Sequence, residues 1–226
     1  MPDAFSIKQV ARSYGSSRWV RGYVSGKLRL DPVFQVARSI IAKRNRQVVD
    51  LGCGLGILGI CLRTSGITVK YKGTDPEPWK INSAKQAMRY FGFEEVGYEV
   101  MDAISTNIPE GATVCLFDVL HYMNDAQQNE LTTRLANAAN SGSVVLIRTA
   151  LRGAGWRYWM TLMEEKWTRL SGWIRGGEIN FPTRQGIVDA FSRHGLTPQI
   201  LPLWGKTPFA SHLIVLSPPQ EPVFRL

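Results

Sequence analysis

The chain has 226 residues, of which 44% are hydrophobic and 20% are charged, and its formal net charge is +9. This composition is typical of a globular protein with one domain, or one domain with a cap, and it excludes intrinsic disorder, collagen and a coiled coil. No run approaches the roughly 18 apolar residues of a membrane-spanning helix, and the first residues have no hydrophobic signal core, so we expect a cytoplasmic protein.

The predicted elements alternate between helices and strands. In chain order they are a helix that starts at Asp31-Pro32, a strand at 47–51, a helix at 57–62, a strand at 69–75, a helix at 78–90, strands at 98–101 and 113–119, a helix at 124–140, a strand at 143–147, a helix at 183–194, and strands at 197–203 and 212–217. This alternation predicts an α/β fold, a Rossmann-like doubly wound sheet that is mostly parallel. Because no helix separates the final two strands, the last strand must run antiparallel.

The positive charge is concentrated at the start of the chain. Residues 1–50 carry ten Lys or Arg and three Asp, a net charge of +7, and the rest of the chain contributes +2. Such a field attracts acidic partners, namely nucleic acid, an anionic membrane or an acidic carrier protein. We therefore expect a basic N-terminal helical arm over residues 1–44, followed by a main domain over 45–226 with a cap insertion at about 150–182.

A glycine-rich stretch follows the first predicted strand, where such sheets bind ligands. Gly54-x-Gly56-x-x-Gly59 matches the dinucleotide-binding fingerprint, and Asp75 lies about 20 residues further on, as that fingerprint requires. This match predicts a nicotinamide-dependent oxidoreductase. The same stretch also fits a second motif.

Asp50-x-Gly52-x-Gly54-x-Gly56 closely resembles motif I of the class I S-adenosylmethionine-dependent methyltransferases, in which an acidic residue precedes alternating glycines. We favour this second interpretation. The carboxylate of Asp50 would repel a pyrophosphate, whereas it suits the ammonium and sulfonium groups of the methyl donor. The antiparallel end of the sheet also resembles this family more than a nicotinamide domain. The resemblance covers about residues 45–148 by motif and 183–217 by architecture.

The resemblance implies a binding site for S-adenosylmethionine at the ends of the first four strands. Its residues would be Asp50, Gly52, Cys53, Gly54, Gly56, Asp75, Pro76, Asp102, Ala103, Phe117, Asp118 and Val119. In this assignment Asp50 sets the loop and holds the amino-acid portion of the donor. Asp75 binds the ribose hydroxyls, and Asp102 binds the adenine amino group.

Two further sequence features narrow the chemistry. The three cysteines, Cys53, Cys61 and Cys115, lack metal-ligand spacing and lie in apolar runs, so we expect reduced core thiols and no metal site. The chain also lacks the Asn/Asp-Pro-Pro-aromatic tetrapeptide that the family uses on the exocyclic amines of nucleobases. The absence of this tetrapeptide favours a small-molecule acceptor over a nucleobase.

His121 is the candidate general base, because imidazole titrates near neutral pH and an oxygen acceptor must lose a proton. The alternative is a structural histidine that packs against the donor or caps the next helix. We expect acceptor contacts from Tyr23, Tyr122, Arg148, Trp156 and Trp159.

The insertion at about 150–182 is rich in aromatic residues at helical spacing, including Trp156, Trp159 and Trp167. We interpret it as a helical aromatic cap over the acceptor. Ordinary packing and an interfacial helix in peripheral contact with a membrane are the alternatives.

A second, weaker resemblance rests on the run Gly26-Lys27-Leu28-Arg29-x-Asp31-Pro32-Val33-Phe34. It is similar to small methyltransferases of bacterial aryl polyene pigment clusters. This likeness implies a phenolic or aryl polyene acceptor, methylated at oxygen or ring carbon, and held free or on an acidic acyl carrier protein. An RNA- or DNA-directed methyltransferase, which the basic arm would suit, and a non-catalytic donor-binding subunit stay open as alternatives.

Overall fold

The computed structural model describes residues 6–93, 96–170 and 179–218, with the side chains of 168–170 left out. The chain divides into two compact units, which we describe separately. The first comprises residues 1–108 and 112–115, and the second comprises 109–111 and 116–226. Within the described ranges, no helix is long and apolar enough to cross a membrane.

The first unit contains a parallel sheet in which β1 (Val48–Leu51) pairs with β2 (Tyr71–Asp75), and β2 pairs with β3 (Val96–Val100). Its helices are α1 (Ile7–Arg12), α2 (Arg18–Leu30), α3 (Val33–Arg44), α4 (Ile57–Thr64) and α5 (Pro78–Tyr90). Helix α5 packs on β2 and β3, and α1 packs on α2. All four residues of β1 are buried, as expected for a central strand of a parallel sheet.

Local side chains define the helix ends of this unit. Ser6 and Gln9 form a capping box that starts α1, and the hydroxyl of Ser17 accepts the amide of Val20 at the start of α2. The carboxylate of Asp31 accepts the amide of Val33, so the predicted helix start at Asp31-Pro32 is confirmed. These contacts satisfy amides that the helices themselves leave unpaired.

The second unit contains the antiparallel end of the sheet. β7 (Ser211–Leu216) lies between β5 (Val144–Ala150) and β6 (Gln199–Pro202) and runs antiparallel to both. The short helix η1 (Leu120–Tyr122) follows β4 (Thr113–Phe117), and the longer helices are α6 (Asp125–Asn140), α7 (Trp156–Leu170) and α8 (Arg184–Ser192). Helix α6 packs against both β5 and α8. The predicted capping box at Asn124 and Gln127 starts α6.

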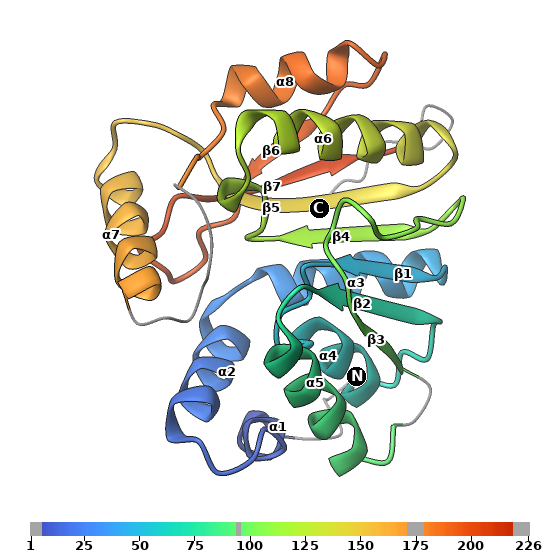
Figure 1. Ribbon diagram of the computed structural model, residues 1–226, viewed down its shortest axis with the longest axis vertical. Helices are drawn as coiled ribbons and strands as arrows, with labels where there is room; N and C mark the ends of the chain where they lie inside the picture. The colour runs from blue at the N-terminus through green and yellow to red at the C-terminus, as the bar shows by residue number, and fades with distance from the viewer. Residues whose placement is uncertain (1–5, 94–95, 171–178, 219–226) are drawn as a thin grey trace. The chain divides into compact units, whose positions relative to one another are not determined.

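The strands form one seven-stranded sheet in the order β3-β2-β1-β4-β5-β7-β6 (Figure 1). The predicted α/β fold with an antiparallel last strand is therefore confirmed. β5 extends to Ala150, three residues past its predicted end at residue 147, because the polar residues Arg148 and Thr149 are buried in the strand.

Candidate active site

The loop between β1 and α4 turns on three glycines with left-handed backbone angles. The φ values are 69° at Gly52, 55° at Gly54 and 69° at Gly56. Residues other than glycine rarely adopt this region of backbone angles. A Cβ on Gly54 would meet no atom within 4 Å, whereas a Cβ on Gly56 would lie 2.6 Å from the hydroxyl of Tyr98. The loop is thus open on one side at Gly54 and closed by packing at Gly56.

Two buried tyrosines hold the carbonyl groups of this loop. The hydroxyl of Tyr14, just after α1, donates to the carbonyl of Leu55 (3.0 Å). The hydroxyl of Tyr98, in β3, donates to the carbonyl of Gly56 (3.1 Å). Sequence analysis missed both residues, because a tyrosine in an apolar run has the same pattern as ordinary core. The loop conformation is therefore fixed from the side that faces the protein.

Asp50 lies under the loop with only 3% of its surface exposed. Its carboxylate accepts a 2.5 Å hydrogen bond from the hydroxyl of Tyr71. Burial raises the pKa of Asp50 to about 7, and the nearby charge of Asp75 adds to this, while the Tyr71 hydrogen bond acts in the opposite direction. Asp50 thus supports the loop from within the core.

Asp75 is the last residue of β2 and Asp102 follows β3, so both lie at the carboxyl ends of these paired parallel strands. One oxygen of Asp75 accepts the amide of Gly54 (3.0 Å), and the other accepts the amide of Glu77 (2.9 Å) and lies 4.0 Å from the ammonium of Lys80. Asp102 is exposed, and its hydrogen bonds from Ser105 lower its pKa, so it is ionised at neutral pH.

Three other residues of this unit, Pro76, Ala103 and Cys53, are predicted to bind the methyl donor. Pro76 is exposed, Ala103 is buried, and the amide of Cys53 donates to the carbonyl of Thr74 (2.8 Å). The glycine loop, Asp75 and Asp102 together give an open backbone surface and two carboxylates. Such a set suits a ligand that has hydroxyl and amine donors.

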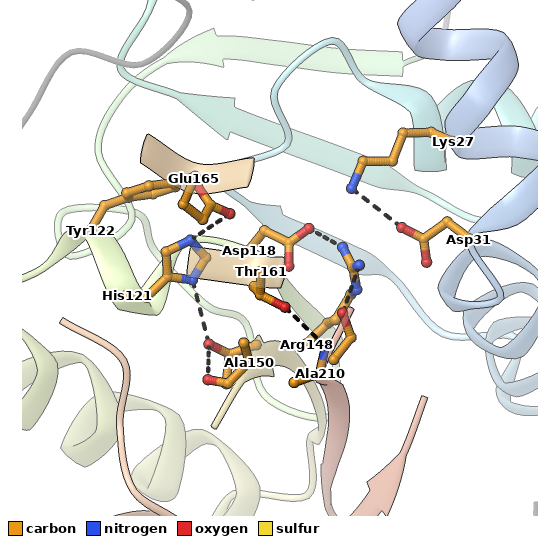
Figure 2. Close-up of polar contacts among 12 residues, drawn as sticks. Lys27, Asp31, Asp118, His121, Tyr122, Arg148, Ala150, Thr161, Glu165 and Ala210 are labelled. Atoms are coloured by element: carbon orange, nitrogen blue, oxygen red, sulfur yellow. Dashed lines mark hydrogen bonds and ion pairs between the residues drawn. The ribbon is translucent and has the colours of Figure 1, made fainter. Parts of the chain in front are cut away.

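The residues of the second unit that are predicted to bind the methyl donor lie at the end of β4 and just after it. Asp118, which comes after Phe117 and before Val119, has a φ of 58°, unusual for a residue other than glycine. Its amide donates to the carbonyl of Arg148 (2.9 Å), and its carboxylate forms an ion pair with the Arg148 guanidinium (Figure 2). Arg148 is buried and also donates to the hydroxyl of Ser211 (3.0 Å).

This ion pair bears on the predicted role of Arg148 in acceptor binding. The predicted donor residue Asp118 and the predicted acceptor residue Arg148 contact each other, which sequence analysis did not foresee. A buried guanidinium that is paired with a carboxylate has its charge compensated. The pair therefore holds the turn after β4 in its unusual conformation.

His121 lies in η1 with only 1% of its surface exposed, beside a carboxylate from α7. Its Nε2 is 3.3 Å from Oε1 of Glu165, and Oε2 of Glu165 accepts a 2.5 Å hydrogen bond from Tyr122. Figure 2 shows His121 beside Glu165. Its Nδ1 lies 3.4 Å from the hydroxyl oxygen of Thr149 in β5. The ring of Phe181 lies 4.8 Å from the imidazole.

The hydrogen bonds around His121 assign different roles to its two nitrogens. The hydroxyl of Thr149 donates to the carbonyl of Ala150 (3.2 Å). The Thr149 oxygen can then accept a hydrogen bond from the N–H group at Nδ1 of His121. Nε2 then faces the carboxylate of Glu165. The two nitrogens therefore have different neighbours, a hydroxyl oxygen at Nδ1 and a carboxylate oxygen at Nε2.

Sequence analysis did not identify Glu165. It lies on the buried face of α7, opposite the tryptophans that drew attention to this segment. Trp156 and Trp159 are 62% and 59% exposed and lie on the other side of the helix from Glu165. The face of α7 beside His121 therefore carries Glu165, and the two predicted acceptor contacts Trp156 and Trp159 lie on the outer face. The fifth predicted contact, Tyr23, belongs to α2 in the first unit.

Comparisons with known proteins place this architecture among the methyltransferases. Residues 26–199 match the family described as "Methyltransferase domain". No curated protein matches the chain by sequence.

Several solved structures share the fold. The magnesium protoporphyrin IX methyltransferase from Synechocystis PCC 6803, crystallised with bound SAH, is 15% identical with a TM-score of 0.64, and the match covers 92% of this chain and 93% of that one. An O-methyltransferase from neocarzinostatin biosynthesis, in complex with S-adenosylmethionine and 2-hydroxy-5-methyl naphthoic acid, is 23% identical with a TM-score of 0.60, covering 91% and 62%. The mitomycin 7-O-methyltransferase is 18% identical with a TM-score of 0.63, covering 95% and 61%. The chain thus spans about three fifths of the length of the last two proteins.

Proposed function

Because the chain belongs to the methyltransferase-domain family, matched over residues 26–199, we propose that it transfers a methyl group from S-adenosylmethionine to a small aromatic acceptor. The acceptor is a phenol, methylated at its oxygen or at a ring carbon. Loss of the phenolic proton activates both positions, so one general base serves either outcome. The observation that carries this proposal is the contact between His121 and Glu165.

The residues of the first unit fit the methyl donor. When bound, S-adenosylmethionine supplies a methyl group on a positively charged sulfonium. The open backbone surface at Gly54 accommodates a ligand against the loop, where a Cβ would obstruct it. Asp75 accepts hydrogen bonds from the ribose hydroxyls, and the exposed, ionised Asp102 accepts one from the adenine amino group.

The same geometry disfavours the oxidoreductase alternative. In a dinucleotide site, the loop amides are left for the pyrophosphate. Here the amide of Gly54 donates to the carboxylate of Asp75, and Asp50 lies beneath the loop. The carboxylate of Asp75 at this position would repel a pyrophosphate, whereas it attracts a cationic donor.

The residues of the second unit fit proton transfer from the acceptor. His121 receives the acceptor's hydroxyl proton at Nε2, the nitrogen that faces the carboxylate of Glu165. Tyr122 holds Glu165 through its 2.5 Å hydrogen bond, and Thr149 fixes the ring through Nδ1. The O–H bond would break as its proton moves to the imidazole. The oxygen's electron pair would form the bond to the methyl carbon, while the bond from that carbon to the sulfonium sulfur breaks and its electron pair stays on the sulfur.

The chain also contributes by orienting the two reactants. Methyl transfer is an in-line displacement at carbon, so its rate depends strongly on alignment. The aromatic rings of Tyr122 and Phe181, which lie 4.1 Å and 4.8 Å from the imidazole of His121, are placed to contact a planar acceptor. We therefore assign acceptor recognition to this aromatic cluster rather than to the outer face of α7.

The test is transfer of a labelled methyl group to a panel of phenols and aryl acids, supplied free and attached to an acyl carrier protein. We expect His121→Ala to slow turnover by about 10²- to 10⁴-fold, the usual contribution of a positioned base, with donor affinity unchanged. Glu165→Gln, which keeps the size of the side chain but removes its charge, should slow turnover by a smaller factor.

His194→Ala serves as the control, because His194 lies after α8 and outside this cluster. It should leave turnover unchanged. Full activity of His121→Ala would remove His121 as the base. Transfer to nucleic acid in place of every phenol would support the nucleic-acid alternative instead.

A further inference from the structure

Helix α2 exposes large side chains that helices of globular proteins usually bury. Trp19 is 78% exposed, Leu30 is 51% exposed and Tyr23 is 40% exposed. At 3.6 residues per turn, the three lie within about 40° of one another around the helix axis. The opposite side of α2 is packed, with Val24 fully buried. One face of the helix is thus an exposed aromatic and aliphatic stripe.

Two exposed arginines lie beside this stripe. Arg18 and Arg29 are separated by three turns, so they lie within about 20° of one another on the same flank. Gly22 and Gly26 occupy the surface between the arginines and the stripe, and a Cβ on either would meet no atom within 4 Å. We call Arg18, Trp19, Tyr23, Arg29 and Leu30 the outer face of α2.

The exposed charged side chains of the described residues 6–50 are all positive. Helix α2 contains no acidic residue. Among described residues 6–50, the two acidic side chains, Asp31 and Asp50, are both buried. The exposed cations of the same segment are Lys8, Arg12, Arg18, Arg29, Lys43 and Arg46. The surface of this segment is therefore complementary to an anionic partner.

We propose that the chain binds an anionic lipid surface through the outer face of α2. Trp and Tyr side chains are favoured at the boundary between headgroups and acyl chains, and arginine side chains reach the lipid phosphates. Each Lys or Arg near an anionic leaflet strengthens the attraction, and exposed acidic side chains would oppose it. The helix lies in the plane of the headgroups, and nothing in this proposal requires the chain to cross the bilayer.

A lipid surface fits this face better than a folded acidic protein does. Trp19 and Leu30 protrude beside the two glycines, so a rigid partner would need pockets matched to each side chain. A fluid interface needs no such match, because lipids rearrange around protruding side chains. The proposal does not depend on methyl transfer, so its test can fail without affecting the proposed function.

The test is co-sedimentation of the full chain with vesicles of phosphatidylcholine alone and of phosphatidylcholine mixed with phosphatidylglycerol. We expect binding to the mixed vesicles only, weakened by added salt. Arg18→Gln/Arg29→Gln should lower the partition coefficient by about tenfold or more. Lys43→Gln/Arg46→Gln removes the same charge from another helix end, and it should have a clearly smaller effect.

A tryptophan pair separates the outer face of α2 from the other exposed aromatic helix. Trp19→Ala should weaken vesicle binding several-fold, whereas Trp167→Ala, which removes a 70% exposed tryptophan from α7, should not. Thermal unfolding of each variant confirms that it is folded. Three results would overturn the proposal. They are an equal loss of vesicle binding in Arg18→Gln/Arg29→Gln and Lys43→Gln/Arg46→Gln, an equal loss in Trp19→Ala and Trp167→Ala, and no binding of the chain to anionic vesicles. Salt-sensitive binding of an acidic carrier protein that needs Arg18 and Arg29, without vesicle binding, would also overturn it.

Discussion

Asp50 places a carboxyl group where almost no water reaches it. The residue is 3% exposed, and its carboxyl group accepts a hydrogen bond from Tyr71. A carboxyl in such surroundings prefers its neutral form, and the pKa of Asp50 accordingly rises from 3.8 to about 7. Because the unfolded chain ionises this group at a lower pH than the folded chain does, Asp50 couples stability to pH.

The sign of this coupling follows from proton binding. Between about pH 4 and pH 7, the folded state holds a proton on Asp50 that the unfolded state has lost, so stability falls as pH rises through this window. We expect Asp50→Asn to remove this loss. Relative to the wild type, the variant should gain about 1 kcal/mol per pH unit up to about pH 7 and then level off. Chemical unfolding at several pH values measures this, and parallel curves for the two proteins would contradict a raised pKa.

Asp75 acts at the surface of the same loop. We expect Asp75→Ala to weaken binding of S-adenosylhomocysteine by about 1–3 kcal/mol, because charge-assisted hydrogen bonds to the ribose are lost. Asp189→Ala, on α8, is the matched control and should bind normally. Unchanged donor affinity in Asp75→Ala, measured by calorimetry, would reject the ribose assignment.

At the scale of elements, the sheet and α4 approach closely enough that only glycine fits between them. A Cβ on Gly59 would lie 2.3 Å from the hydroxyl of Tyr98, whereas a Cβ on Gly54 would meet nothing. Tyr98 in β3 and Gly59 in α4 thus set the spacing beneath the loop. The third glycine of the fingerprint-like pattern therefore serves packing.

The close approach of Gly59 and Tyr98 predicts that a glycine-to-alanine substitution changes stability differently at Gly59 and at Gly54. Gly59→Ala should destabilise the fold by about 1–3 kcal/mol through overpacking, and Tyr98→Phe should relieve part of that cost in the double variant. Gly54→Ala should cost about 1–2 kcal/mol from backbone strain alone, with no relief from Tyr98→Phe. Denaturant unfolding of the three single variants and the two double variants measures the coupling. Equal coupling at both glycines would show that Tyr98 does not limit the space at Gly59.

Local signals in the sequence were sufficient for most elements. α5 has the predicted bounds 78–90, since Pro78 starts it and Gly92 follows it, and the Asn124 capping box starts α6 as predicted. The ends of strands were less certain. β3 starts at Val96, two residues earlier than predicted, because pairing with β2 and not residue pattern sets its length.

The candidate site could be predicted only in part, for a related reason. Residues that follow strand ends, such as Asp75 and His121, are marked by their place in a local pattern. The partners that define their roles come from distant parts of the chain. Glu165 lies 44 residues after His121 on the buried face of α7, and Arg148 joins Asp118 although 30 residues separate them. Such contacts depend on tertiary packing, which no local pattern specifies.

For the whole molecule, the distribution of charge and exposed aromatic side chains connects the proposed lipid binding with the proposed methyl transfer. The N-terminal segment carries most of the net charge, and its described acidic side chains are buried. If α2 docks on anionic lipid, a hydrophobic phenol dissolved in that lipid would be available close to the enzyme. We expect methyl transfer to a membrane-soluble phenol to be faster with anionic vesicles than with neutral ones, and this gain should vanish in Arg18→Gln/Arg29→Gln.

Calorimetric titration of S-adenosylmethionine and S-adenosylhomocysteine into the purified chain, with reduced nicotinamide dinucleotide as the comparison, tests the donor assignment most directly. We expect both sulfur compounds to bind with Kd in the micromolar range, and the dinucleotide not to bind. Binding of the dinucleotide in their place, or binding of none of the three, would contradict a donor site built on Gly54, Asp75 and Asp102.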